Sequence, residues 1–213
     1  MTVRVNEIFA SIQGETSRAG FPSLFIRLAG CNLRCAFCDT SYSWDEGTDM
    51  SIEEVVEHAF PFRWVDHVTL TGGEPLAQPE TPLLARALLD QGFRVRVETN
   101  GSYPVSVLPE ECEKMIDIKP PSSGEQESFC RENFALLTGR DEVKLLASDD
   151  LDLAYAFSLC RNELAGTEAS INISPVAGRF SPAALAERIL DEKLNVRLNL
   201  QLHAILWPGG EPK

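Results

Sequence analysis

Short apolar segments with many β-branched residues alternate along this chain with segments of helical periodicity, and this alternation constrains the fold most strongly. The expected strands cover residues 24–29, 68–71, 95–99, 115–118, 143–146, 171–174 and 196–203, with a further one over 3–9. The expected helices cover residues 52–59, 83–91, 151–163 and 182–191. Because strands that are joined through helices pair in parallel, the pattern predicts an α/β fold with a mainly parallel sheet.

The length of the chain narrows the choice among parallel α/β architectures. Its 213 residues suffice for one domain with a substantial core, and they contain no internal repeat and no linker composition. A complete eight-stranded barrel takes about 250 residues. We therefore expect a single domain over residues 1–213, either a partial barrel or an open twisted sheet, whose ligands bind at the carboxyl ends of the strands.

Charge and composition exclude several functional classes. The chain has 19 Lys and Arg against 32 Asp and Glu, and its net charge of -13 repels the phosphates of nucleic acids. No apolar run approaches the ~18 residues that a membrane span needs, and the first residues do not resemble a secretion signal. We therefore expect a cytoplasmic protein that binds neither nucleic acid nor membrane, in which cysteines are free thiols or metal ligands.

Two of the expected helices have recognisable first residues. Ser51 followed by Glu54 has the spacing of a capping box. Ser181 followed by Pro182 combines an N-cap residue with proline at the first helical position. Both patterns predict where the helix begins.

Three cysteines have the pattern C-x3-C-x2-C in the loop over residues 30–50, which follows the strand over 24–29. Cys31, Cys35 and Cys38 can supply three thiolates from one loop. An electron-transfer [4Fe-4S] cluster takes four cysteines, so three would leave one iron open to a substrate or cofactor. A closed zinc site and buried thiols are the alternatives, and the nearest histidine, His58, falls in an expected helix. The remaining cysteines show no pairing and are expected to be structural thiols: Cys112, Cys130 and Cys160.

Polar residues follow three other expected strands. After residues 68–71, the segment Gly72-Gly73-Glu74-Pro75 allows a close backbone approach, and Glu74 could accept a hydrogen bond from an ammonium group. Such a turn is common in α/β proteins and indicates little by itself. Asp117 to Lys119, and Ser174, close two later strands just before a proline, which suits ligand contacts but is also ordinary at strand ends.

Together these motifs resemble the radical S-adenosylmethionine (SAM) superfamily. The cysteine spacing, with Phe37 before the last cysteine, is similar to its cluster motif, and residues 72–75 are similar to its GGEP segment. The resemblance implies an incomplete TIM-like barrel and a [4Fe-4S] cluster whose open iron binds the amino and carboxylate groups of SAM. One electron then cleaves SAM to methionine and a 5′-deoxyadenosyl radical, which abstracts a hydrogen atom from the substrate.

The same resemblance assigns cofactor contacts residue by residue. These contacts are Phe37, Cys38, Asp39, Gly73, Glu74, Asp117, Lys119 and Ser174. Many relatives have Ser-Pro-Lys where this chain has Asp117-Ile118-Lys119, so the lysine matches their pattern and Asp117 departs from it.

Further segments resemble one family of the superfamily, the 7-carboxy-7-deazaguanine synthases: residues 7–15, 25–31, 38–40, 98–101 and 201–203. The resemblance implies conversion of 6-carboxy-5,6,7,8-tetrahydropterin to 7-carboxy-7-deazaguanine with loss of ammonia, on the route to queuosine and related 7-deazapurines. It also implies Mg²⁺ on Thr40, a homodimer, and an electron donor such as flavodoxin or ferredoxin. The implied substrate contacts are Ile12, Gln13, Gly14, Glu15, Arg27 and Thr71.

The residues themselves leave two of these roles open. Arg27 lies in an apolar strand and needs an acidic partner. That partner could be a substrate carboxylate held by the planar guanidinium, or it could be Glu15 or Glu98. Thr40 beside Asp39 suits a magnesium ligand or a helix cap.

Other predicted contacts lie near the ends of strands. Gln13 and Thr71 could bind the heterocycle or be ordinary turn and strand-end residues. Gln201 and His203 fall on the polar face of the expected last strand, toward ligand or solvent. Residues 7–15 are polar enough to leave the first strand for a loop in which Gly14 frees the backbone. Residues 204–213 are expected to be flexible, and residues 208–213 either cover the substrate or fray.

Two other functions are compatible with the cysteine motif. A glycyl-radical-enzyme activating enzyme shares the spacing and a comparable length, but its protein substrate would not require residues 12–15 or Arg27. A small iron–sulfur or zinc module without catalysis would need only the cysteines.

Overall fold

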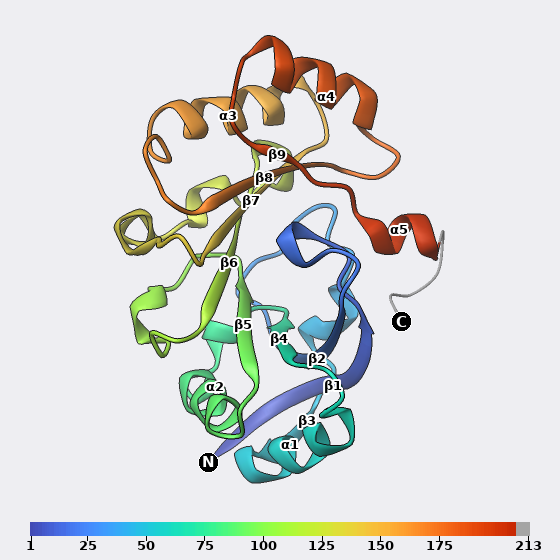
Figure 1. The fold of residues 1–213 in the computed structure, drawn as a ribbon, viewed down its shortest axis with the longest axis vertical. Coiled ribbons are helices and arrows are strands. Elements are labelled where there is room, and N and C mark those ends of the chain that lie inside the picture. Colours follow the sequence, from blue (N-terminus) through green and yellow to red (C-terminus); the bar gives the residue numbers. More distant parts are fainter. Residues whose placement is uncertain (208–213) are drawn as a thin grey trace.

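The computed structural model describes residues 1–207, which form one curved sheet with the longer α-helices on its outer side (Figure 1). The nine strands have the order β3-β1-β2-β4-β5-β6-β7-β8-β9 within this part of the chain. They are β1 (Thr2–Ile12), β2 (Pro22–Leu28), β3 (Thr48–Ser51), β4 (His67–Gly72), β5 (Arg94–Thr99), β6 (Glu113–Ile118), β7 (Glu142–Ala147), β8 (Ser170–Pro175) and β9 (Arg197–Leu198). The α-helices are α1 (Ile52–Ala59), α2 (Thr81–Asp90), α3 (Asp150–Arg161), α4 (Pro182–Asp191) and α5 (Leu202–Leu206).

The strand pairing confirms the predicted partial barrel. From β2 to β9, each strand pairs in parallel with the next one in the sheet. Strand β1 is antiparallel to both β2 and β3, and β3 and β9 form the edges of the sheet. The carboxyl ends of the parallel strands therefore lie together at one end of the partial barrel, where ligands bind in such folds. No helix of residues 1–207 is long and apolar enough to cross a membrane.

Successive residues of the parallel strands point to opposite faces of the sheet. One set is almost completely buried in the core: Ile26, Leu70, Val97, Ile116 and Leu145. Helical residues of the same core are Val55, Leu84, Leu88, Leu153 and Leu185. The neighbours of the first set along the chain line a cavity on the concave side: Arg27, Thr71, Glu98, Asp117 and Lys144. The alternation therefore separates an apolar core from a polar interior.

The loop after β1 is fixed on the concave side by polar contacts. The Thr16 backbone N–H donates to Asn199 Oδ1 at 2.8 Å, and Arg96 donates to Thr16 Oγ1 at 2.6 Å. Arg96 also pairs with Glu142 at 2.7 Å. Thr16 has a φ of 64°, a costly conformation for a β-branched residue, which these contacts offset. They hold residues 13–15 over the interior of the barrel.

The expected strand over residues 196–203 is wrong. Only Arg197–Leu198 pairs with β8, and residues 202–206 form α5. Leu200 is 41% exposed, whereas Asn199 is buried and donates to Ser174 Oγ at 2.8 Å, so the apolar side of the expected strand does not continue past Leu198. The chain leaves the sheet because it bonds to the loop after β1, where the Leu202 N–H donates to the Gly14 carbonyl at 2.9 Å.

Three boundaries near the termini and the cysteine loop also differ from expectation. Residues 7–12 stay in β1, because they pair with β2 and their polar side chains gain partners on the concave side. Strand β3 was not expected, and it takes the last residues of the predicted loop over 30–50. Residues 204–206 belong to α5, and 208–213 lie outside the described residues, so the expectation of a flexible or covering tail is not addressed there.

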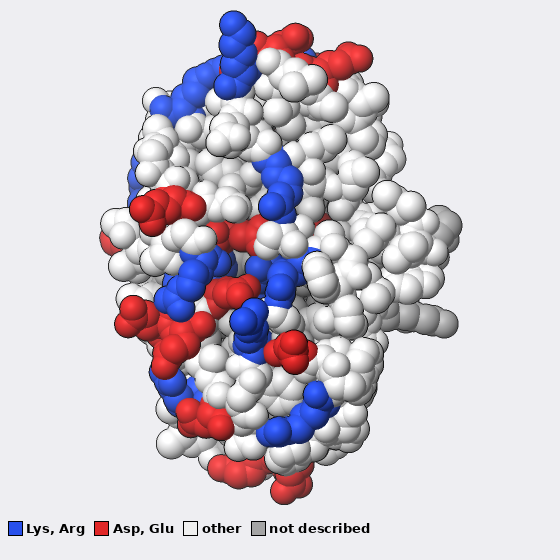
Figure 2. Space-filling model, in the orientation of Figure 1, with Lys and Arg blue, Asp and Glu red and all other residues white. Residues whose placement is uncertain are grey.

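Charged side chains of both signs mix on the surface. Figure 2 shows a band on one face in which Lys and Arg lie next to Asp and Glu, while the side where α5 lies in Figure 1 carries few charges. Exposed pairs such as Arg188 with Asp150 and Arg86 with Glu111 contribute little to stability. The net charge of -13 is therefore not gathered in one acidic patch on this face.

Both predicted helix starts are confirmed. Ser51 Oγ accepts the Glu54 N–H at 3.1 Å, and Glu54 Oε2 accepts the Ser51 N–H at 2.7 Å, which completes the capping box. Ser181 Oγ accepts the Ala184 N–H at 3.4 Å, and Pro182 is the first residue of α4.

Replacing Ser51 with alanine should lower the free energy of unfolding by about 1 kcal/mol, because the first turn of α1 loses a hydrogen-bond acceptor. Denaturant unfolding followed by circular dichroism measures this difference. Ser106→Ala, at an exposed position in a 3-10 helix that has no side-chain cap, is the matched control. Equal stabilities for the two variants would contradict the role of the capping box.

Candidate active site

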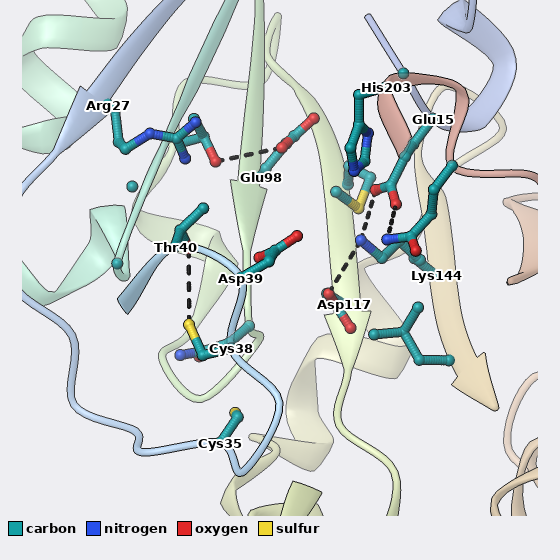
Figure 3. A pocket seen from close by; sticks show the side chains of 18 of the residues that line it. Glu15, Arg27, Cys35, Cys38, Asp39, Thr40, Glu98, Asp117, Lys144 and His203 are labelled. Carbon is teal, nitrogen blue, oxygen red and sulfur yellow. Dashed lines mark hydrogen bonds and ion pairs between the residues drawn. The ribbon is translucent and has the colours of Figure 1, made fainter. Parts of the chain in front are cut away.

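A cavity of about 540 Å³ lies on the concave side of the sheet and contains most of the predicted site residues. Small-molecule sites typically measure about 300–1,000 Å³. Figure 3 shows Arg27 on one side of the cavity, Glu15, Lys144 and Asp117 on the other, and Cys35 and Cys38 toward one end. The predicted residues that line it are Ile12, Gln13, Gly14, Glu15, Arg27, Cys31, Cys35, Phe37, Cys38, Asp39, Thr40, Thr71, Gly73, Asp117, Lys119, Gln201 and His203.

The cysteine loop is anchored to the turn that follows β6. The Ala36 N–H donates to the Ser123 carbonyl at 3.1 Å, and the Arg34 N–H donates to Glu125 Oε1 at 2.8 Å. All three thiols are free and half-buried. Burial raises the pKa of Cys35 to about 11, so its thiolate needs a strong cationic partner such as iron.

Gly73 brings the end of β4 against the cysteine loop. A Cβ atom at this position would lie 2.2 Å from the Gly30 carbonyl oxygen and 2.8 Å from the Cβ of Cys31. The Glu74 N–H donates to that same carbonyl at 2.8 Å. Only glycine permits this approach, so the Gly-Gly segment fixes the position of the first cysteine.

Two of the predicted cofactor contacts lie outside the cavity lining. Glu74 is fully buried, and its carboxylate accepts hydrogen bonds from Thr99 Oγ1 at 2.7 Å and from the N–H groups of Leu76 and Asn100. Three hydrogen bonds within the protein therefore occupy most of the acceptor sites of this carboxylate. Ser174 is also fully buried, and its hydroxyl oxygen accepts the amide of Asn199. Both residues support the walls of the cavity.

Arg27 has an acidic partner that sequence reasoning did not consider. Its Nε donates to Glu7 Oε1 at 2.7 Å, and neither Glu15 nor Glu98 bonds to it. Glu7 lies directly opposite Arg27 in the β1–β2 pairing, whereas its spacing in the sequence gave no sign of this contact. The alternative that Glu15 or Glu98 pairs with Arg27 is therefore wrong, because the antiparallel pairing of β1 with β2 was not predicted.

A row of buried charges runs along the opposite side of the cavity (Figure 3). Lys144 Nζ lies 2.5 Å from Glu15 Oε2 and 3.3 Å from Asp117 Oδ2, and Lys119 Nζ lies 3.1 Å from the same Asp117 oxygen. Burial by itself would raise the pKa values of Glu15 and Asp117, but the lysines outweigh it and lower both. Both carboxylates are therefore ionised at neutral pH. Lys144 was missed because its segment reads only as a buried strand.

Gln13, Thr71 and Glu98 form a hydrogen-bonded group between these two sides. Gln13 Nε2 donates to Glu98 Oε1 at 3.0 Å, and Thr71 Oγ1 donates to Glu98 Oε2 at 3.2 Å. Burial raises the pKa of Glu98, which favours its protonated form. Glu98 was absent from the predicted ligand contacts, although its place at the end of β5 could have indicated it.

Gly14 makes room for the segment that ends the described chain. A Cβ on Gly14 would lie 2.5 Å from His203 Nδ1, so a side chain there would displace the histidine from the cavity wall. The φ of Gly14 is not in the left-handed region, so glycine is not required there for the expected backbone freedom. It is required because a side chain would collide with His203. Gln201 Nε2 donates to Glu15 Oε1 at 3.1 Å. Gln201 and His203 thus line the cavity although no strand carries them.

Thr40 and Asp39 lie beside the last cysteine. Thr40 Oγ1 is 3.7 Å from Cys38 Sγ, and Thr40 makes no side-chain cap to the 3-10 helix that follows it (Ser41–Trp44). The capping alternative for Thr40 is therefore wrong, and Thr40 lines the cavity.

Within residues 1–207, no group of three or more His, Cys, Asp or Glu side chains is arranged to hold one metal ion.

Comparison with known proteins agrees with this arrangement. The family model described as "Radical SAM superfamily" matches residues 25–123, which include the last four residues of β2, the cysteine loop and the Gly-Gly segment. A 7-carboxy-7-deazaguanine synthase from Chlorobaculum tepidum is 41% identical over 96% of this chain and 94% of its own length. One from Methanospirillum hungatei JF-1 is 42% identical over 96% of this chain and 85% of its own length. The crystal structure of QueE from Escherichia coli shares the fold, with a TM-score of 0.79, 24% identity and 95% coverage of both chains.

The partial barrel and its three-cysteine loop define a radical SAM enzyme. At the identity and coverage of the curated relatives, the chain belongs to the 7-carboxy-7-deazaguanine synthase family.

In protein without a cluster, alkylation of Cys35 should be slow at neutral pH, because a pKa of about 11 keeps the thiol protonated. The rate should rise about tenfold per pH unit between about pH 8 and pH 10, since only the thiolate reacts. Peptide mass spectrometry after timed iodoacetamide treatment measures it. In guanidinium chloride, which unfolds the protein and exposes the thiol, Cys35 should no longer be alkylated more slowly than an ordinary cysteine. A rate for the folded protein that levels off below about pH 9 would contradict burial of this thiol.

Proposed function

We propose that this chain converts 6-carboxy-5,6,7,8-tetrahydropterin to 7-carboxy-7-deazaguanine with loss of ammonia, as a radical SAM enzyme of 7-deazapurine biosynthesis. One observation carries the proposal: a buried guanidinium, that of Arg27, faces a polar cavity that also contains three cysteines of one loop. The name of the relatives specifies a carboxylated product. A carboxylated ligand in this cavity would find its ion partner in Arg27.

The donor groups fit the cofactors of the superfamily. Three soft thiolates suit a [4Fe-4S] cluster with one open iron, and the buried Oδ1 of Asp117 has no hydrogen-bond partner within residues 1–207, so it can accept from a bound molecule. SAM would lie among Phe37, Asp39, Gly73, Asp117 and Lys119. When bound, cluster and SAM together supply a 5′-deoxyadenosyl radical that abstracts a hydrogen atom from the substrate.

The remaining lining residues suit the pterin. The terminal nitrogens of Arg27 donate no hydrogen bond to any residue of 1–207, so both can bind the substrate carboxylate. The ionised Glu15 on the opposite side can accept from the amino and N–H groups of the ring. Glu98, when protonated, can donate as well as accept. These groups would hold the ring between Arg27 and Glu15, in the same cavity as the three cysteines.

The proposal includes several partners. Mg²⁺ would bind to Thr40 alone among protein groups, since this ion keeps water ligands and takes further oxygens from a substrate. An electron donor such as flavodoxin or ferredoxin, a homodimer, a single domain over 1–213 and a cytoplasmic location follow from likeness to the family. The net charge of -13 supports a protein without a nucleic-acid partner, and we propose no membrane partner.

Anaerobic turnover of reconstituted protein with 6-carboxytetrahydropterin, SAM, Mg²⁺ and a reductant tests the function. Mass spectrometry should detect 7-carboxy-7-deazaguanine, and Cys35→Ala should abolish it because the cluster loses a ligand. Cys160→Ala, in α3 and outside the cavity lining, is the control that should remain active. An intact cluster that yields 5′-deoxyadenosine without a deazapurine would overturn the substrate assignment.

Removal of the Thr40 hydroxyl tests the magnesium site. Thr40→Ala should raise the Mg²⁺ concentration needed for half-maximal turnover by at least about tenfold, whereas Thr40→Ser should not, because it keeps the oxygen ligand. Thr48→Ala, at an exposed position in β3, controls for a general effect of losing a threonine. The same Mg²⁺ dependence in all variants would contradict a ligand role for Thr40.

A further inference from the structure

We infer that Glu7 and Tyr42 are positioning residues, which orient the guanidinium of Arg27 so that its two terminal nitrogens bind a ligand carboxylate side by side. The inference rests on the proposed function, because it concerns the carboxylate of the proposed pterin. It adds two residues that would not touch the substrate. Their contacts with Arg27 come from two different elements, β1 and the 3-10 helix Ser41–Trp44, which follows the last of the three cysteines.

Glu7 fixes one edge of the guanidinium. The Arg27 Nε donates to Glu7 Oε1 at 2.7 Å across the β1–β2 pair, so the Nε edge faces the strand and the opposite edge faces the cavity. The Arg27 side chain is 8% exposed, which leaves little space for another rotamer. A carboxylate binds best when both nitrogens of one edge point to its two oxygens. The contact with Glu7 therefore preserves the free edge for a ligand.

Tyr42 fixes the same pair from the other direction. Its hydroxyl donates to Glu7 Oε1 at 2.9 Å, and its ring lies 5.8 Å from the central carbon of the Arg27 guanidinium, within the range of a cation–π contact. A tyrosine hydroxyl carries its proton at neutral pH, so it can donate to the Glu7 carboxylate. Tyr42 follows Cys38 by four residues, and it thereby links the cysteine loop to the residue that would hold the substrate.

A simpler reading is that Glu7 only neutralises Arg27, and it makes the opposite prediction. Without the negative charge of Glu7, a guanidinium that needs no positioning would attract a carboxylate more strongly. A guanidinium that needs positioning would lose its orientation in Glu7→Ala and bind a carboxylate less well. Glu7→Gln separates the two, because the amide oxygen still accepts from Nε and from Tyr42 while the charge is lost.

Binding of two pterins to the cluster-reconstituted, SAM-loaded protein tests the inference without turnover. The probes are pterin-6-carboxylate and pterin, which lacks the carboxylate, titrated anaerobically by their fluorescence. Glu7→Ala should weaken pterin-6-carboxylate about tenfold, the effect of one lost charged hydrogen bond. Its affinity for pterin should stay at the wild-type value. Glu7→Gln should remain within about twofold of wild type for both probes, and Tyr42→Phe should show a smaller loss for the carboxylate only.

Two controls make each outcome decisive. Glu57→Ala removes an exposed carboxylate from α1 and should change neither affinity. Arg27→Ala should abolish the preference for pterin-6-carboxylate.

If wild type and Arg27→Ala show the same preference, the carboxylate site of the proposed function fails, and this inference fails with it. If Arg27→Ala loses the preference but Glu7→Ala keeps or strengthens it, only the positioning role is overturned. Equal weakening of both probes by Glu7→Ala would show a general structural defect and also overturn it.

Discussion

The parallel pairing of β2 with β4, and of each later strand with its neighbour, is the constraint on which the rest of this structure depends. It brings together, at one end of the partial barrel, the carboxyl ends of strands that are far apart in the sequence. The alternation of side chains then sends Ile26 and Leu70 into the core and Arg27 and Thr71 into the cavity. A shift of one residue in any pair would exchange the two faces, so the core and the site are specified together.

The interior of the barrel is polar, and burial of its charges is tolerated because nearly all of them are paired. Lys144 contacts both Glu15 and Asp117, and Arg27 contacts Glu7, so no cation among these stands without a carboxylate. A buried ion that lost its partner would be strongly unfavourable. The unpaired Asp117 Oδ1 and the free edge of Arg27 are then the places where a ligand completes the hydrogen bonding. The same contacts that stabilise the apoprotein shape the site around them.

Much of the fold and part of the site could be predicted from local patterns. The first residues of α1 and α4 followed from Ser51 and Ser181, because an N-cap is satisfied by a residue only three positions away. Periodicity failed at residues 196–203, where contacts with a segment almost 200 positions earlier decide the conformation. Glu7, Tyr42 and Lys144 escaped prediction for the same reason, since their roles depend on a register that no local pattern records.

The sequence by itself determined the class of fold, the three-cysteine loop and the family, because strand and helix periods, caps and motif spacing are properties of neighbouring residues. The tertiary structure alone decided which charges meet: that Arg27 pairs with Glu7, that Lys144 holds Glu15, and that Gly14 leaves space for His203. The physical reason is the separation along the sequence of the residues that interact. Periods, caps and motifs involve residues a few positions apart, whereas the partner of a buried charge is set by strand order and register across the whole sheet.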